Sequence, residues 1–404
     1  MAAILPLAVV VAATDSLSGK LNMPRSRALL ALTASALALP GMTPQVKADA
    51  APTTSTVAYR YSSYEEDPLD KRVLLVGSQE RYDIQIHQLS LLTPLGESTA
   101  VNVVSSVESM SGASPWYTIS GISGDPQVVM SGASISEQRR DISATVRRYL
   151  NNGTLGFTLA TSHENDYRSL SGGVDMDRHF NNDLTTLATG FSFSSDDLSP
   201  TDATLFNRIL DASKQSRSVF VSISQILNQS SVLQSGLSIT HLAGYLTDPY
   251  KLADRRPDSR TQLAWSTAYR KFFGSMAGAL HADYRFYHDS FGINSHTLDL
   301  AWYQNIGDTW QLVPGLRYYS QSAAGFFTVA NDFVGSTPNS SDFRLSAYGA
   351  YSYSLKIQLQ VEAFTLTLSG ERYLSDNQAG TWSGPASPAL VDFTRLSFGA
   401  SYSF

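Results

Sequence analysis

Three residues able to bind a hard metal ion alternate along one short segment of the chain. In "DMDRH", Asp175, Asp177 and His179 occupy every second position, so they would share one face of a strand. Carboxylates and imidazoles are ligands for divalent cations. Three such residues on one strand are more often polar lining, so we predict no bound metal here.

Histidines near carboxylates or hydroxyls offer a second kind of chemistry. His281 lies two positions before Asp283, and His288 lies two positions before Ser290, a spacing that a hydrolase site could use. His288 and Ser290 have no identifiable oxyanion donor, and seven scattered histidines make chance pairs common. The chain has no cysteine, which excludes a thiol nucleophile, a disulfide framework and a cysteine metal site. We therefore expect no enzyme activity and no cofactor.

Strands with one apolar and one polar face would carry these residues. The chain ends in "LSFGASYSF", in which Leu396, Phe398, Ala400, Tyr402 and Phe404 alternate with serine and glycine. This period of two is typical of a strand. The longest alternating stretch spans 342–361, and the apolar phase flips after it, so a tight turn near Glu362 must separate two strands. Pro314 interrupts another stretch, where we expect a local bulge.

Composition favours a closed barrel over a set of soluble domains. Charged residues make up only 16% of the 404 residues, whereas aromatic residues reach 11%, with 20 Tyr and 18 Phe. After residue 50, however, no segment has the roughly 20 unbroken apolar residues that a membrane helix needs. A barrel resolves this conflict because it places apolar residues at every second position.

The predicted connections are alternately short and long, as in outer-membrane barrels. The short turns fall at 93–98, 151–153, 181–183, 228–231, 273–276, 306–309 and 360–363. The longer connections are 65–80, 111–138, 197–215, 247–258, 322–341 and 375–390. We therefore predict an all-β, transmembrane, antiparallel up-and-down barrel over 51–404. It has about sixteen strands, with fourteen or eighteen as alternatives.

The first 50 residues read as a secretory leader. A basic region with Arg25 and Arg27 precedes an apolar run over 28–39, and small residues at 48 and 50 suit cleavage after Ala50. Met23 is an alternative start. Removing 1–50 takes away four basic and two acidic side chains, so the formal charge of -6 becomes -8. An acidic mature chain argues against a nucleic-acid partner.

Strand parity predicts which charged residues face the interior. They are Asp83, His87, Arg147, Asp175, Asp177, His179, Arg270, His281, Asp283, Arg285, Asp299, Arg317, Arg344, Glu371 and Arg395. They would hydrate and brace a water-filled lumen by cross-strand pairing. A sharper alternative is charge selectivity, set by Arg285, Arg317 and Arg344 against carboxylates of neighbouring strands.

Aromatic residues and one loop complete the set of predicted features. Trp302 and Trp310 flank the turn at Gly307 and suit an aromatic girdle at a membrane interface, although core packing is the alternative. Loop 111–138 contains Trp116 and could either narrow the lumen or cap its mouth.

Several stretches resemble a bacterial family known as a domain of unknown function, number 3570. They include "ERYDIQIHQLSLLTPLG", "ESMSGASPWY", "YRFYHDSFGINSHTLDLAWYQ" and "LVPGLRYYSQSAA". The resemblance covers nearly all of the mature chain and implies an outer-membrane barrel in a Gram-negative envelope. It implies no substrate and no catalytic residue. A strand ending in Phe404, with Phe398 and Tyr402 on the same face, also resembles bacterial outer-membrane proteins, whose end is read by the barrel-assembly machinery.

We therefore expect an outer-membrane channel or porin-like barrel for small polar solutes or ions. A plugged docking barrel for a secreted or periplasmic partner is one alternative, and an outer-membrane hydrolase is another. The expected partners are outer-membrane lipid, the assembly machinery with its periplasmic chaperones, and the solute. The sequence leaves open the charge selectivity and whether the barrel is a homo-oligomer.

Overall fold

The structure is a computed structural model that describes residues 50–131, 135–251, 253–331 and 337–404. The predicted leader lies almost entirely outside these residues, so cleavage after Ala50 and a start at Met23 stay predictions. Over the described ranges, no helix has the length and apolar character needed to cross a membrane.

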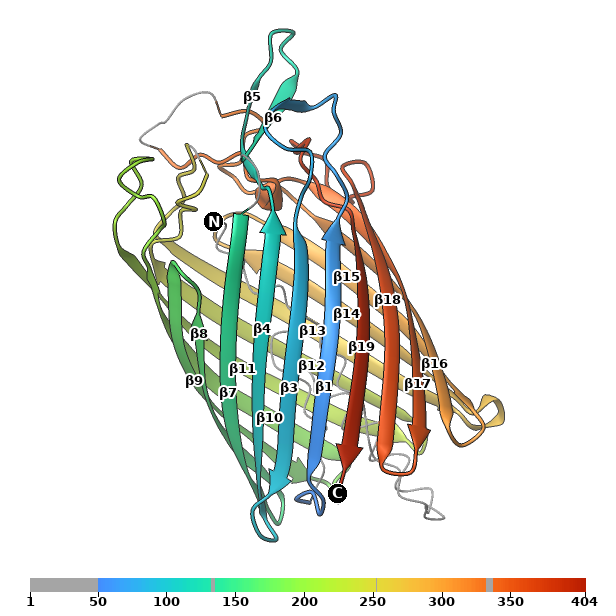
Figure 1. The fold of residues 1–404 in the computed structure, drawn as a ribbon. Coiled ribbons are helices and arrows are strands. Elements are labelled where there is room, and N and C mark those ends of the chain that lie inside the picture. The colour runs from blue at the N-terminus through green and yellow to red at the C-terminus, as the bar shows by residue number, and fades with distance from the viewer. Residues whose placement is uncertain (1–49, 132–134, 252, 332–336) are drawn as a thin grey trace.

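The described residues contain sixteen antiparallel strands that close into one barrel, which confirms the predicted fold and strand number (Figure 1). In chain order these strands are β1 (Thr56–Glu66), β3 (Asp83–Pro94), β4 (Thr99–Gly112), β7 (Ile135–Leu150), β8 (Gly153–His163), β9 (Tyr167–Phe180), β10 (Thr185–Leu198), β11 (Ala212–Asn228), β12 (Ser231–Gly244), β13 (Ser259–Phe273), β14 (Gly278–Asp289), β15 (Asn294–Ile306), β16 (Trp310–Gln321), β17 (Tyr348–Val361), β18 (Phe364–Asp376) and β19 (Phe393–Ser403).

The last strand closes the barrel against the first. β19 pairs with β1 over its whole length, from Thr56 opposite Ser403 to Glu66 opposite Phe393. Beyond this ladder, the backbones of Ser55 and Phe404 exchange two hydrogen bonds of 2.8 Å. Because β18 pairs with the other side of β19, the closure leaves no free sheet edge.

The two rims of the barrel differ. At one rim, which we call the short-turn rim, consecutive strands are joined by turns of at most four residues, one of them containing the 3-10 helix η1 (Gly274–Met276). Asn181, Asn182, Asp183 and Glu362 have positive φ angles in these turns, and asparagine and aspartate tolerate that conformation better than most residues. The opposite, long-loop rim carries the extended connections.

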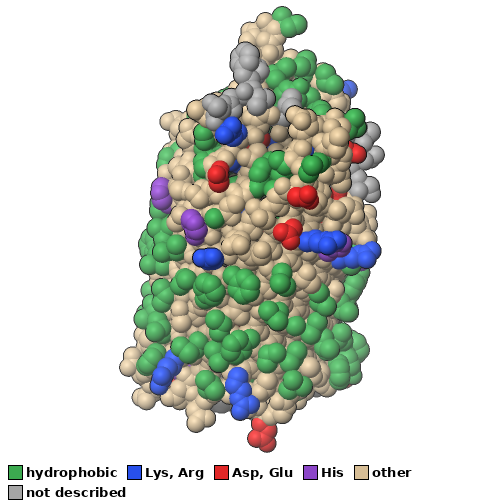
Figure 2. All heavy atoms as spheres, turned by 90° about the vertical axis from the view of Figure 1, so that its left-hand side faces the viewer, with side chains coloured by type: hydrophobic (Ala, Val, Ile, Leu, Met, Phe, Trp, Pro, Cys, Tyr) green, Lys and Arg blue, Asp and Glu red, His purple; other side chains and the backbone are tan. Residues whose placement is uncertain are grey.

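The outer face of the barrel is apolar. Figure 2 shows the side on which β8 and β9 lie, where apolar side chains form a band in the half nearer the short-turn rim. Leu159 and Leu170 belong to these exposed positions, at 66% and 59% of their possible exposure. Such a surface is stable against lipid but not in water.

The predicted long strand over 342–361 is wrong at its beginning. β17 starts only at Tyr348, and residues 343–345 form the 3-10 helix η2 (Phe343–Leu345). The Asp342 side chain caps η2 by accepting a hydrogen bond of 3.1 Å from the backbone N–H of Arg344. Leu345 is buried against Phe291 and Phe327 of neighbouring loops. The alternation in 343–347 therefore reflects loop packing.

The bulge predicted at Pro314 is also wrong. The ladder between β15 and β16 lacks pairs opposite Val313 and Pro314, but it resumes beyond them in the same register. Proline has no N–H to donate. The interruption is thus a local loss of pairing without an inserted residue.

A second, smaller sheet stands above the long-loop rim (Figure 1). It has the order β2-β6-β5, formed by β2 (Leu74–Val76), β6 (Pro126–Met130) and β5 (Pro115–Ser120). Val128 and Met130 of β6 are fully buried, in one apolar cluster with Leu69 and Ala389. The described part of loop 111–138 thus rises from the barrel as this sheet.

Candidate functional site: the charged interior and its mouth

Alternation along the strands places most of the predicted lining residues on the inward face. These are Arg147, Asp175, Asp177, His179, Arg270, His281, Asp283, Arg285, Asp299, Arg317, Glu371 and Arg395. Their neighbours in sequence are the exposed apolar residues of the outer face, such as Leu298 beside Asp299 and Leu316 beside Arg317. That this face lines a pore stays a prediction.

Three residues of the predicted set lie elsewhere. His87 and Asp83 share the parity of the exposed Leu89 and Leu91, so they face outward, and the Tyr59 hydroxyl lies 2.8 Å from His87 Nδ1 on that face. Arg344 belongs to η2 at the mouth and not to a barrel strand. The predictions that placed these three residues on the inward face of strands are wrong.

Cross-strand ion pairs follow one wall of the interior. Arg317 donates to Asp299, directly opposite it on β15, with an Nε–Oδ1 distance of 2.6 Å. Arg395 donates to Glu371, opposite it on β18, over 2.6 Å. Arg270 pairs with Asp283. Each charge is therefore held in place by its partner in the adjacent strand, which gives the wall a fixed pattern of both signs.

Asp175, Asp177 and His179 of the DMDRH segment contact other protein side chains on another part of the wall. Arg147 donates to both oxygens of Asp175, at 2.9 and 3.2 Å. Asp177 accepts from the hydroxyl and the N–H of Thr154, and His179 Nε2 lies 3.6 Å from Asp177. These contacts brace β7, β8 and β9 against one another.

The histidines considered for hydrolysis have other partners. His281 stacks on Tyr303 with the ring centroids 4.1 Å apart. His288 Nδ1 lies 2.9 Å from Asn294 Oδ1, and the Ser290 hydroxyl accepts from the N–H of Thr261. His288 also faces outward, since it shares the parity of Phe286. This geometry does not support a serine–histidine pair.

Ion pairs hold the loops together at the mouth. Asp342, buried with 1% of its surface exposed, accepts from Arg344 Nε at 2.8 Å and from Arg256 Nη2 at 2.7 Å, and Lys251 Nζ lies 3.9 Å away. Arg344 also donates to Asp248 over 2.9 Å. Loops 245–258 and 322–347 are thereby tied to each other.

The same cluster reaches a third loop and has a marked electrostatic effect. Lys251 Nζ donates to the carbonyl of Pro115 over 2.7 Å, which ties loop 113–131 to the other two. Burial alone would raise the pKa of Asp342, but Arg344, Lys251 and Arg256 hold it well below the usual value. The carboxylate therefore stays ionised below the pH at which an ordinary aspartate takes up a proton.

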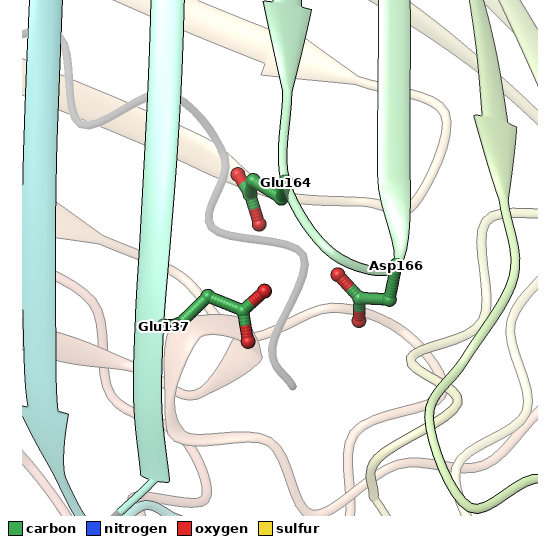
Figure 3. A group of neighbouring side chains, drawn as sticks. All are labelled: Glu137, Glu164 and Asp166. Carbon is green, nitrogen blue, oxygen red and sulfur yellow. The ribbon is translucent and has the colours of Figure 1, made fainter.

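An acidic cluster that the sequence analysis missed lies nearby on the long-loop rim (Figure 3). Glu137 comes from β7, whereas Glu164 and Asp166 come from the turn between β8 and β9, and carboxylate oxygens of all three lie within 4.8 Å of one another. Burial raises the pKa of Glu164 to about 7 against the lowering effect of Arg139. In the sequence, only the neighbouring acidic residues of "END" (164–166) indicate such a cluster, because Glu137 is distant from them along the chain.

Carboxylate oxygens suit a hard cation, but each group of the cluster has a protein partner. Glu137 accepts from the N–H of Asn165 over 3.2 Å, and Asp166 accepts from the Tyr250 hydroxyl. Glu164 lies 3.9 Å from Arg139 Nε. We therefore assign no ion to the cluster.

The aromatic residues singled out by the sequence lie toward the short-turn rim. Trp310 is exposed on the outer face at the start of β16, and Trp302 packs on Phe273 with ring centroids 5.5 Å apart. On β19, Phe398 and Tyr402 face outward, with Phe404 just beyond the strand. A girdle role and an assembly role both stay predictions.

The comparisons with known proteins agree with this architecture. The model of the family described as "Protein of unknown function (DUF3570)" matches residues 29–389. The chain belongs to this family. The family description states no activity, so membership by itself indicates no substrate. None of the curated proteins compared with the chain matches it.

Solved structures with a similar fold include CdiB, a porin and a siderophore receptor. CdiB from Acinetobacter baumannii is 8% identical with a TM-score of 0.51, over 87% of this chain and 60% of that one. A BenF-like porin from Pseudomonas fluorescens Pf-5 is 8% identical with a TM-score of 0.46, over 87% and 98%. The siderophore receptor PirA from Pseudomonas aeruginosa is 11% identical with a TM-score of 0.43, over 85% and 61%. At this identity the likeness to CdiB shows the fold alone.

Proposed function

We propose that this protein is an outer-membrane channel that passes small polar solutes or ions. The observation that carries the proposal is a closed barrel of sixteen strands whose inward face is charged and whose outward face is apolar. Barrels of about eight strands are filled by their side chains, whereas those of sixteen to eighteen strands commonly enclose an aqueous passage. The long-loop rim would face outside the cell and the short-turn rim the periplasm.

The mouth supports a channel of restricted size. The loops joined by Asp342 are drawn together at the long-loop rim, and η2 brings Phe343 against Arg81 and Lys251 from two other loops. A solute entering from outside would pass these loops before meeting the ion pairs of the wall. We infer that entry selects small solutes by size and the wall then selects them by charge.

Conductance tests the proposal directly. Protein purified from the membrane and reconstituted in planar bilayers should give discrete, reproducible single-channel steps and a measurable ratio of cation to anion permeability. The folded state is checked in the same preparation by the shift in gel mobility on heating. Folded protein that remains silent at all voltages and salts would contradict the channel.

A docking barrel is the second candidate, favoured by the exposed apolar residues of the small sheet. Val76 of β2 is 61% exposed, and Ile122 in the turn between β5 and β6 is fully exposed. β2 and β5 are the edges of that sheet. Exposed apolar residues on open edges suit a protein partner. A stoichiometric partner that co-purifies with a silent barrel would favour this function over the channel.

A further inference from the structure

Basic side chains form a row on the outer face, near the long-loop rim. Arg140 on β7 lies opposite His163 on β8, and His163 lies opposite Arg168 on β9. All three are exposed and share the outward parity of Ile142, Leu159 and Leu170. Since opposite Cβ atoms in antiparallel pairs are about 5 Å apart, the three side chains reach a common spot.

The row marks one edge of the apolar band. Along β9, Arg168 and Arg178 are the basic residues of the outward face, separated by Leu170, Val174 and Met176. Ten positions of a strand span about 34 Å, and the usual tilt of barrel strands reduces this to about 25 Å along the axis. That is the height of a membrane-embedded apolar band. Figure 2 shows basic side chains at both edges of the band.

The row therefore lies at the depth of the lipid headgroups, and several of its N–H groups donate to no acceptor among the described residues. Arg140 uses Nε and Nη2 to bind the Gln138 side chain, at 3.0 and 2.7 Å, which leaves its other N–H groups. In the described structure, the side chains of His163 and Arg168 have no hydrogen-bond or ion-pair partner. Asp197 on β10 lies directly opposite Arg168 on the same outward face, but the two side chains form no ion pair. The acidic groups of the β8–β9 turn contact Arg139 and Tyr250 instead.

We propose that Arg140, His163 and Arg168 bind the phosphate-bearing headgroup of a lipid in the leaflet at the long-loop rim. The chain as a whole is acidic, so this basic row is a local feature and not a consequence of net charge. Guanidinium groups match phosphate oxygens in geometry and charge, and the acyl chains would lie on the apolar residues below. The inference needs the barrel to sit in a membrane but does not need it to conduct.

Native mass spectrometry of the full-length barrel in detergent tests this. The probe is diphosphorylated lipid A, compared with the same lipid after removal of both phosphates. We expect tight retention of the phosphorylated lipid only. The double variant R140Q/R168Q should weaken it about 30-fold, as expected from two basic contacts near a charged membrane surface. The matched control is R148Q/R178Q, which removes two outward arginines at the other edge of the band and should change retention little.

Three results would overturn the proposal: equal retention of the dephosphorylated lipid, equal loss in both double variants, or displacement of the lipid by inorganic phosphate at the affinity of the lipid itself. Heat-dependent gel mobility of each variant confirms that its barrel is folded, and these surface substitutions break no buried contact. Conductance of R140Q/R168Q should match that of the unaltered protein, so failure of the lipid site and failure of the channel would be distinguishable.

Discussion

Asp342 is the residue on which the mouth depends most. Its carboxylate contacts three cations from two loops and is almost fully buried. Removing one partner from such a group leaves buried charge without compensation and costs about 3 to 5 kcal/mol. Because the pKa of Asp342 is depressed, this stabilisation is present above the pKa of an unfolded aspartate and is lost only as pH falls through the lower, folded value.

We therefore expect D342N to loosen the mouth without unfolding the barrel. Trypsin should cleave loop 245–258, after Lys251 or Arg255, at least tenfold faster than in the unaltered protein, because local opening exposes these bonds. Mass spectrometry of the fragments measures the rate. D202N, in an exposed part of loop 199–211, is the matched control and should change nothing. Equal cleavage in the two variants would mean that Asp342 does not hold the loops.

Glu164 should make stability depend on pH in the opposite sense. Burial raises its pKa to about 7, above the value of about 4.3 in an unfolded chain. The folded state therefore binds the proton more tightly, and the stability that this provides below pH 4.3 is lost as pH rises through 7. We expect E164Q to be more resistant than the unaltered protein to heating in SDS at pH 8, with the difference shrinking toward pH 5. The exposed control E97Q should show the same pH dependence of resistance as the unaltered protein. If E164Q showed that same dependence, the prediction would be wrong.

At the scale of elements, the terminal strand decides whether the barrel closes. β19 forms ladders with both β1 and β18, and the backbone of Phe404 extends the first of them. We expect deletion of Phe404 to lower the amount of heat-modifiable barrel in the membrane several-fold, since both closure and the predicted assembly signal are affected. L396A, an exposed apolar position on the same face of β19, is the control. Equal effects of the two changes would assign Phe404 no special part.

The strands can be predicted from the sequence where one face of the barrel meets lipid and the other meets water. The prediction is wrong where loops pack against the inner face. Alternation of apolar and polar residues predicts a strand and the direction of its side chains as long as only one of its two faces is shielded from water. Near the mouth the inside is dry too: Ile84 packs inward against Tyr64, Tyr82 and Met110. At this end of β3 the inward residues Ile84 and Ile86 are therefore the apolar ones and Asp83, Gln85 and His87 face outward, although Leu89 and Leu91 farther along the same face are apolar. The cluster around Asp342 joins residues of separate loops, and the cluster around Glu164 joins a strand to a distant turn, so no local sequence pattern predicts either set of contacts.

At the scale of the whole molecule, selectivity should follow from fixed pairs of charges on the wall. Asp299 and Arg317 oppose each other on β15 and β16, so each offsets the field of the other at one position in the passage. We expect R317Q to raise the ratio of cation to anion permeability and D299N to lower it, because each variant leaves the other charge uncompensated. Reversal potentials in a salt gradient measure the ratio. The double variant R317Q/D299N should return close to the unaltered value, which separates a charge effect from a change in shape. Shifts of the same sign in both single variants would mean that this pair does not face the permeating ions.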